Sequence, residues 1–282
     1  MAVIEATTAE SRGGVKDDMG SLRVLQVTDT HLFADLAGRL AGIDTERSYA
    51  EVMEKVLGEF WPVDLILVTG DLVHDGSESG YRRFKSQFED LAVRTLVIPG
   101  NHDDPALMHR IFSSGRVTWS DSALLGQWQF VMLDSSLAGS AAGHLAESQL
   151  QMLEQCLAAY PEYHALVCLH HHPIAIGCDW IDRIAVDNGS ELFTVLDRHE
   201  QVRGVIWGHV HQEFESTRHG VRLLASPSTC VQFRPGQQDF TVDDVPPGFR
   251  WLQLYADGRI ETSVVRVSAP PSDVDLECKG YR

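Results

Sequence analysis

Residues 65–75 read LILVTGDLVHD, an apolar and β-branched run that ends abruptly at a glycine, an aspartate and a histidine. A short apolar run bounded by turn residues is typical of a buried strand in a parallel sheet. The same pattern recurs at residues 22–28, 95–99, 165–169 and 202–207. We therefore predict five buried strands, each of which delivers polar side chains at its carboxyl end.

Helical patterns separate these strands. Apolar side chains recur at helical spacing across residues 45–60 and again across residues 147–159, as in helices with one buried face. Alternating strands and helices indicate a layered α/β domain. Two-residue turns within residues 123–134, 213–225 and 249–267 predict antiparallel hairpins. The expected fold is an α/β sandwich of two mixed β-sheets flanked by helices.

The chain is long enough for one domain with a large core, with 282 residues of which 44% are hydrophobic. We expect a flexible N-terminal tail over residues 1–20 and a single domain over residues 21–267. Within that domain, residues 233–248 are rich in Pro, Gly, Gln and Asp and predict a long loop or cap. Residues 268–282 are expected to form a C-terminal tail.

Charge and composition exclude several classes of function. The formal net charge of −17 argues against a nucleic-acid partner, although metal ions could still attract a small anion. Apolar runs fall far short of the roughly 18 residues of a membrane helix, and residues 1–20 lack the apolar centre of a secretory signal. Five cysteines without a CxxC pair argue against disulfides or a thiolate zinc site. We expect a cytoplasmic protein with reduced thiols and no membrane association.

The polar residues at the strand ends are types that bind metal ions. In chain order they are residues 29–31 (DTH), 70–75 (GDLVHD), 100–103 (GNHD), 170–173 (HHHP) and 208–211 (GHVH). Sites in open α/β sheets form beyond the carboxyl ends of strands, so these clusters are expected to converge on one crevice. Imidazole and carboxylate ligands together suit manganese, iron and zinc. The pattern therefore predicts a metal site.

These motifs, DxH, GDxx, GNH(D/E), a histidine at a strand end and GHxH, resemble those of the calcineurin-like metallophosphoesterases. The resemblance implies the fold of that family and two divalent metal ions, with iron and manganese favoured and zinc as an alternative. Carried over position by position, it assigns Asp29, His31, Asp71 and His211 to the first ion. It assigns Asp71, Asn101, His170 and His209 to the second.

The resemblance also implies a mechanism. Asp71 would bridge the two ions, because a shared carboxylate and a bridging hydroxide offset the repulsion between two cations. The hydroxide would attack phosphorus, and His102 would contact the phosphate and protonate the leaving oxygen. The substrate is thus expected near His31, Asp71, Asn101 and His102, of which Asp71, Asn101 and His102 are the catalytic candidates. The partner of His102 is left open between Asp75 and Asp103.

Of the three adjacent histidines His170, His171 and His172, we expect only one to be a metal ligand. Alternation along a strand turns neighbours to opposite sides, and the resemblance selects His170. His172 could share the face of His170, whereas His171 could pack behind the site or meet the substrate. His74 is expected to lie behind the ligands or at the surface rather than to bind metal.

Further stretches are similar to the bacterial class III 3′,5′-cyclic AMP phosphodiesterases. They are residues 28–33 (TDTHLF), 169–173 (LHHHP), 177–180 (GCDW), 227–233 (PSTCVQF) and 247–251 (PGFRW). The similarity implies that the protein binds a small-molecule cyclic nucleotide, cyclic AMP, and hydrolyses it to 5′-AMP. This reaction would lower the cytoplasmic level of cyclic AMP. Trp180, Phe233 and Phe240 either cover the adenine or simply pack.

Other functions stay open at this point. The alternatives are a broad phosphodiesterase that acts on 2′,3′-cyclic nucleotides or other diesters, a protein phosphatase and a scaffold without activity. The scaffold is disfavoured because His102 and every expected metal ligand are present. Monomer and homodimer are both compatible with the sequence.

Overall fold

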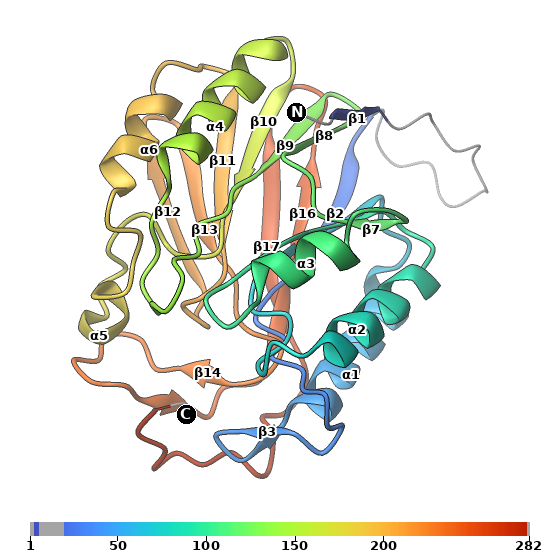
Figure 1. Cartoon of the computed structure of the whole chain (residues 1–282), viewed down its shortest axis with the longest axis vertical. Helices are drawn as coiled ribbons and strands as arrows, with labels where there is room; N and C mark the ends of the chain where they lie inside the picture. Colours follow the sequence, from blue (N-terminus) through green and yellow to red (C-terminus); the bar gives the residue numbers. More distant parts are fainter. Residues whose placement is uncertain (1–2, 6–19, 281–282) are drawn as a thin grey trace.

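Two β-sheets lie face to face and helices cover their outer faces, as Figure 1 shows. The computed structural model of the chain describes residues 3–5 and 20–280. One cluster of buried apolar side chains fills the space between the sheets, and a second and a third lie between each sheet and its helices. The predicted α/β sandwich of two mixed sheets is therefore confirmed.

The first large sheet has seven strands in the order β1-β8-β9-β10-β11-β13-β12. Their bounds are Val3–Glu5 (β1), Ser122–Leu125 (β8), Trp128–Met132 (β9), His164–Cys168 (β10), Val202–Trp207 (β11), Val221–Ala225 (β13) and Phe214–Arg218 (β12). Strands β9, β10, β11 and β13 are parallel neighbours, whereas β8 and β12 join as antiparallel hairpins. Two of the predicted hairpins are thus present.

The second large sheet has six strands in the order β17-β16-β2-β5-β6-β7. Their bounds are Ile260–Arg266 (β17), Gly248–Leu254 (β16), Leu22–Val27 (β2), Leu65–Thr69 (β5), Thr95–Ile98 (β6) and Val117–Thr118 (β7). Strands β2, β5, β6 and β7 are parallel, and β16 and β17 form the third predicted hairpin. Every residue of β5 is buried, as expected for a strand covered on both faces.

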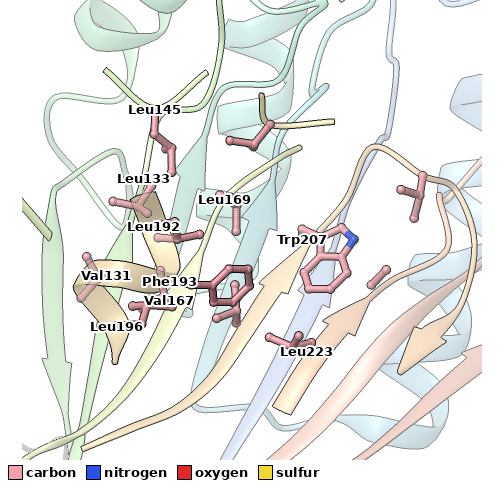
Figure 2. Close-up of a cluster of buried hydrophobic side chains, with 14 of the residues drawn as sticks. Val131, Leu133, Leu145, Val167, Leu169, Leu192, Phe193, Leu196, Trp207 and Leu223 are labelled. Carbon is pink, nitrogen blue, oxygen red and sulfur yellow. The ribbon is translucent and has the colours of Figure 1, made fainter. Parts of the chain in front are cut away.

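Alternation along the strands distributes side chains between the layers. In β5, Leu67 faces the other sheet, whereas Ile66 and Val68 face the helices α1 (Thr45–Lys55) and α2 (Glu78–Asp90). In the first sheet, α4 (Glu147–Ala159) and α6 (Gly189–Leu196) cover the outer face. Figure 2 shows that apolar cluster, in which Phe193 of α6 lies near Val167 of β10.

Local chemistry fixes where the helices begin. Asp44 accepts a hydrogen bond from the Arg47 amide at the start of α1, and Ser77 does the same for the Gly80 amide at α2. The helix predicted over residues 45–60 is only partly regular. Its α-helical part ends at Lys55, and Val56–Phe60 (η1) continue as a π-helical turn. Among the described residues, no helix has the length and apolarity that a bilayer span requires.

Smaller elements surround one end of the sandwich. They are α3 (Pro105–Ile111), α5 (Asp179–Asp182), the hairpin of β3 (Arg39–Leu40) and β4 (Ile43–Asp44), and the hairpin of β14 (Gln232–Phe233) and β15 (Val242–Asp243). The segment expected as a long loop or cap over residues 233–248 therefore contains Phe233 of β14, the turn of this hairpin and all of β15.

Both expected tails differ in part from the structure. Residues 1–2, 6–19 and 281–282 lie outside the described residues, but β1 pairs in parallel with β8. The expected tail therefore includes a short strand, in which the β-branched pair Val3 and Ile4 extends the sheet edge. At the other end, Asp273 binds Arg39 and Arg47 at 2.6 and 2.8 Å, so this part of the expected C-terminal tail is attached to the domain.

Candidate metal centre and active site

The carboxyl ends of five parallel strands meet at one end of the sandwich, and each carries part of the predicted site. Strand β2 leads to Asp29 and His31, β5 to Asp71, β6 to Asn101, β10 to His170, and β11 to His209 and His211. The structure brings these seven predicted metal-site residues together, as the distances below show. All except Asn101 are buried.

The backbone at these ligands is held in an unusual conformation. Asp29, His31, Asp71, His209 and His211 all have positive φ angles, between 45° and 64°. L-residues rarely adopt this left-handed region, and such strain gathers at functional sites. Hydrogen bonds between loops hold it in place, since the amides of Asp29 and His31 donate to the carbonyls of Gly70 and Asp71 at 3.0 and 2.9 Å.

A first group of ligand atoms comes from Asp29, His31 and His211, whose atoms lie within 4.8 Å of one another. His211 Nε2 lies 3.2 Å from Asp29 Oδ1 and 3.3 Å from His31 Nε2. The Nδ1 of His211 donates to the Val231 carbonyl at 2.8 Å, which leaves the lone pair of Nε2 directed into the site. Two imidazoles and a carboxylate thus converge, and together they offer three ligand atoms to one cation.

A second group gathers around His170. Its Nε2 lies 3.4 Å from Asp71 Oδ2 and 3.3 Å from Asn101 Oδ1. Its Nδ1 donates to the Thr69 carbonyl at 2.7 Å, so Nε2 is again the atom available to a metal ion. Asp71 Oδ2 is also 3.6 Å from His31 Nε2. The Asp71 carboxylate therefore lies between the two groups, where a bridging ligand belongs.

Two further histidines, His209 and His171, have a ring nitrogen that is available to bind a metal ion. His209 Nε2 and His171 Nε2 are buried without a hydrogen-bond partner among the described residues. Ligand atoms of His209, His171 and His170 lie within 4.8 Å of one another. Buried polar atoms without partners are costly, and a bound cation would satisfy the nitrogen of His209. The donor set therefore fits a pair of divalent ions.

His171 and His172 have partners outside the first two groups. His171 Nδ1 lies 2.8 Å from Ser135 Oγ, and His172 Nε2 lies 3.2 Å from Asp182 Oδ1. Only His170 has a short approach to both Asp71 and Asn101. The geometry supports the choice of His170, which stays a prediction until metal binding is measured.

Burial and charge set the protonation of the site. Burial lowers the pKa of His31 and His209 well below the usual value, which favours the neutral imidazole that binds metals. At His170, burial acts downward, but the Asp71 carboxylate outweighs it and raises the pKa to about 9. Burial alone would raise the pKa of Asp71, yet His170 and His102 hold that pKa well below its usual range. Asp71 is thus ionised at neutral pH.

His102 lies beside the two groups. Its ring stacks on His74 with centroids 4.5 Å apart and lies edge-on to His31 at 5.0 Å. His74 Nδ1 is 3.1 Å from His31 Nδ1, so His74 lies directly beside a predicted metal ligand. Ligand atoms of these three histidines also lie within 4.8 Å of one another, which makes the metal content of a His102 variant informative.

The two carboxylates considered as partners of His102 organise loops. Asp103 accepts hydrogen bonds from the amides of Leu72, Val73 and Gly100 and from the Tyr81 hydroxyl, at 2.9 to 3.2 Å. It therefore joins the loop after β5 to the loop after β6. Asp75 accepts from the Ala34 amide at 2.9 Å and from Ser77. The role of Asp103 was not predicted, although its place in the GNHD motif was the available signal.

Close packing at Gly208 gives a first prediction. A Cβ at this residue would lie 2.0 Å from Thr28 Oγ1 and 2.6 Å from Asp29 Oδ2. Gly208→Ala must therefore displace the Asp29 carboxylate, and a displacement of about 1 Å can cost about 10²-fold in rate. We expect that loss in kcat/KM together with weaker Mn²⁺ binding by calorimetry. Gly58→Ala is the control, since nothing lies within 4 Å of its added Cβ, and equal losses in both variants would contradict this account.

A cavity of about 230 Å³ opens over the clustered ligands. Its polar side comprises His31, Asp71, Asn101, His102, His209 and His211, and its apolar side comprises Ala141, Trp180, Ile181, Ile184, Phe233 and Phe240. A larger groove of about 750 Å³ lies by α2 and α3. The cationic side chains that line this groove already have partners, since Arg82 binds Glu78 and Lys85 binds two backbone carbonyls. The smaller cavity is the candidate active site.

Comparison with known proteins decides the family. The family model for calcineurin-like phosphoesterases matches residues 22–213. The chain belongs to the calcineurin-like phosphoesterase family. The family that the sequence motifs indicated is thereby confirmed. This phosphoesterase family uses a dinuclear metal site, for which the clustered carboxylates and imidazoles are candidate ligands.

Bacterial relatives of this phosphoesterase match nearly its whole length. The 3′,5′-cyclic adenosine monophosphate phosphodiesterase CpdA of Pseudomonas aeruginosa is 44% identical over 261 residues, which cover 93% of this chain and 96% of that protein. The protein of the same name from Escherichia coli (strain K12) is 41% identical over 261 residues, which cover 92% and 95%. The similarity to bacterial cyclic AMP phosphodiesterases seen in the motifs therefore extends along the chain.

Solved structures confirm the fold of this phosphoesterase. A dimetal phosphatase from Danio rerio superposes with a TM-score of 0.58 at 16% identity, covering 89% of this chain and 100% of that one. A purple acid phosphatase from yellow lupin seeds gives a TM-score of 0.59 at 15% identity, covering 88% and 54%. At these identities the likeness concerns the fold alone.

Proposed function

We propose that this phosphoesterase hydrolyses 3′,5′-cyclic AMP to 5′-AMP and so lowers the cyclic nucleotide level of the cell. The cavity of about 230 Å³ supports this substrate, because it joins a polar side built from candidate metal ligands to an apolar side with three aromatic rings. A cyclic nucleotide has a matching division into an anionic phosphate and a flat base. The names of the bacterial relatives support the same substrate.

Two divalent ions are part of the proposal. Asp29, His31, Asp71 and His211 would hold the first ion, and Asp71, Asn101, His170 and His209 the second. Bound there, such ions supply a water of lowered pKa and positive charge for the phosphate oxygens. The mixture of imidazole and carboxylate favours iron and manganese, with zinc as an alternative.

The residues of the chain perform the remaining steps. His31, Asn101 and His102 line the cavity beside Asp71, where they orient the phosphate. In its protonated form, His102 donates a proton to the 3′ oxygen as the bond from phosphorus to that oxygen breaks. The product then keeps its phosphate on the 5′ oxygen. Asp71 holds its place by accepting a hydrogen bond from the His102 amide at 2.9 Å.

A cytoplasmic location and a small-molecule substrate complete the proposal. All five cysteines are free thiols and four are buried, as suits a reducing compartment. The net charge of −17 disfavours a nucleic-acid partner. The protein would act as a monomer or a homodimer.

A substrate panel tests the proposed function. Purified protein with Mn²⁺ is given cyclic AMP, 2′,3′-cyclic AMP and bis(p-nitrophenyl) phosphate, with Asn101→Ala as the blank. We expect the highest kcat/KM for cyclic AMP. Equal or higher values for the other two would replace the proposal with a phosphodiesterase of broad specificity.

A further inference from the structure

Two separate segments build the apolar side of the cavity. Helix α5 and the turn after it bring Trp180, Ile181 and Ile184, and the hairpin of β14 and β15 brings Phe233 and Phe240. The rings of Trp180, Phe233 and Phe240 touch edge to face, with centroids 4.9, 5.0 and 5.2 Å apart. We call these three residues the aromatic wall. All five of these side chains are uncharged, so they suit a neutral group of the ligand.

The aromatic wall directly adjoins the candidate metal ligands. The Phe233 ring lies parallel to the His211 ring, with centroids 4.2 Å apart and planes at 10°. The Phe233 amide also donates to the His211 carbonyl at 3.3 Å. A phosphate bound among the ligands would therefore place the rest of its molecule against these rings.

The carboxylate of Asp182 anchors the wall. It accepts hydrogen bonds from the amides of Ile176, Gly177 and Cys178 at 2.9, 3.1 and 3.1 Å. Its Oδ1 also lies 3.2 Å from Nε2 of His172. Residues 176–178 thus fold around the Asp182 carboxylate, which lies two residues after Trp180. The same carboxylate connects this turn to His172, which follows β10.

The two segments are also joined to each other. Cys178 Sγ lies 3.5 Å from the Gln237 carbonyl and 3.7 Å from the Arg234 carbonyl. Arg183 donates to the Gln238 carbonyl at 3.2 Å. Displacement of α5 would therefore also disturb the hairpin of β14 and β15, which carries Phe233 and Phe240.

We propose that the aromatic wall is a purine-base subsite and that Asp182 is the positioning residue that sets it. The inference deepens the proposed function and rests on it for the identity of the substrate. A purine offers two flat apolar faces, and aromatic side chains stack on such faces with little dependence on hydrogen bonds. The subsite then favours phosphate esters that carry a purine over esters that do not.

Competitive inhibition tests the subsite independently of cyclic AMP turnover. The enzyme with Mn²⁺ hydrolyses methyl p-nitrophenyl phosphate, a diester without a base, in the presence of 5′-AMP or ribose 5-phosphate. Ribose 5-phosphate keeps the sugar and the phosphate and has a hydroxyl in place of the base, so the ratio of the two inhibition constants reports the contribution of the base. In the unaltered protein we expect 5′-AMP to bind about 5- to 150-fold more tightly, the range measured for one stacked base.

The variants Trp180→Ala and Asp182→Ala should each reduce that ratio to within about twofold of one, since the stacking contribution is lost. General damage to the site cancels in the ratio. Trp180→Phe, which keeps a ring, should restore most of the preference. Trp251→Ala and Asp179→Ala are matched controls, because Trp251 is half-buried on β16 and Asp179 is exposed on α5, and both should keep the full ratio.

Two results would overturn the inference: a ratio near one in the unaltered protein, or an unchanged ratio in both Trp180→Ala and Asp182→Ala. Failure of the proposed function has a different signature. In that case cyclic AMP is not hydrolysed, while the inhibition ratio still reports on the base.

Discussion

Asp71→Ala is expected to abolish measurable hydrolysis and to remove at least one metal ion per chain. The carboxylate lies between both groups of ligand atoms, with Oδ2 3.6 Å from His31 Nε2 and 3.4 Å from His170 Nε2. Without it, two neighbouring cations would repel with no shared negative charge between them. Loss of residues that merely support a metal ligand costs about 10- to 100-fold, so loss of the shared ligand should exceed about 10³-fold.

Metal content and activity should be measured on the same preparation of the Asp71 variant. Asp71→Asn is the conservative companion, since it keeps the size of the side chain and removes its charge, and it should lose activity to a similar extent. Asp90→Ala, at the exposed end of α2, controls for the loss of a carboxylate elsewhere. An Asp71→Ala protein with two bound ions and ordinary turnover would refute the bridging role.

His102→Ala is expected to keep both metal ions and to lower kcat by about 10²- to 10⁴-fold, the usual contribution of one general acid or base. Its ring borders the cavity, where it meets His74 and His31. The proposed metal ligands do not include it, so its removal should affect proton transfer rather than metal binding.

Comparison of two substrates sharpens the His102 test. A good leaving group such as p-nitrophenolate needs little protonation. The variant should therefore lose less of its rate with bis(p-nitrophenyl) phosphate than with cyclic AMP. His219→Ala removes an exposed histidine and serves as the control. Loss of a metal ion from His102→Ala would instead indicate that the cluster of His31, His74 and His102 binds metal.

The fold was predictable because its decisive strands are locally encoded. Within the stretch 65–75, residues 65–69 form strand β5, which is buried at every residue and ends directly before Gly70. The helix over residues 147–159 begins and ends as predicted. Strand β10 starts one residue before the predicted run. The pairing of β1 and the attachment of Asp273 depend on contacts between distant parts of the chain, for which the local sequence offers no signal.

The sequence motifs were sufficient to predict which residues gather at the site. Strand ends determine where the ligands converge, so five motifs were sufficient to place Asp29, Asp71 and their neighbours together. The triple histidine was harder, because β10 ends at Cys168 and alternation along a strand no longer applies beyond it. The contacts of His171 with Ser135 and of His172 with Asp182 required the three-dimensional structure.

The proposed reaction adds water to the phosphorus of cyclic AMP and expels the 3′ oxygen. Hydrolysis in water enriched in ¹⁸O, with Mn²⁺ present and Asn101→Ala as the blank, tests it most directly. We expect mass spectrometry of the product to show 5′-AMP with one ¹⁸O in its phosphate, and the blank to show none. Formation of 3′-AMP, or intact cyclic AMP beside a fully metal-loaded protein, would contradict it.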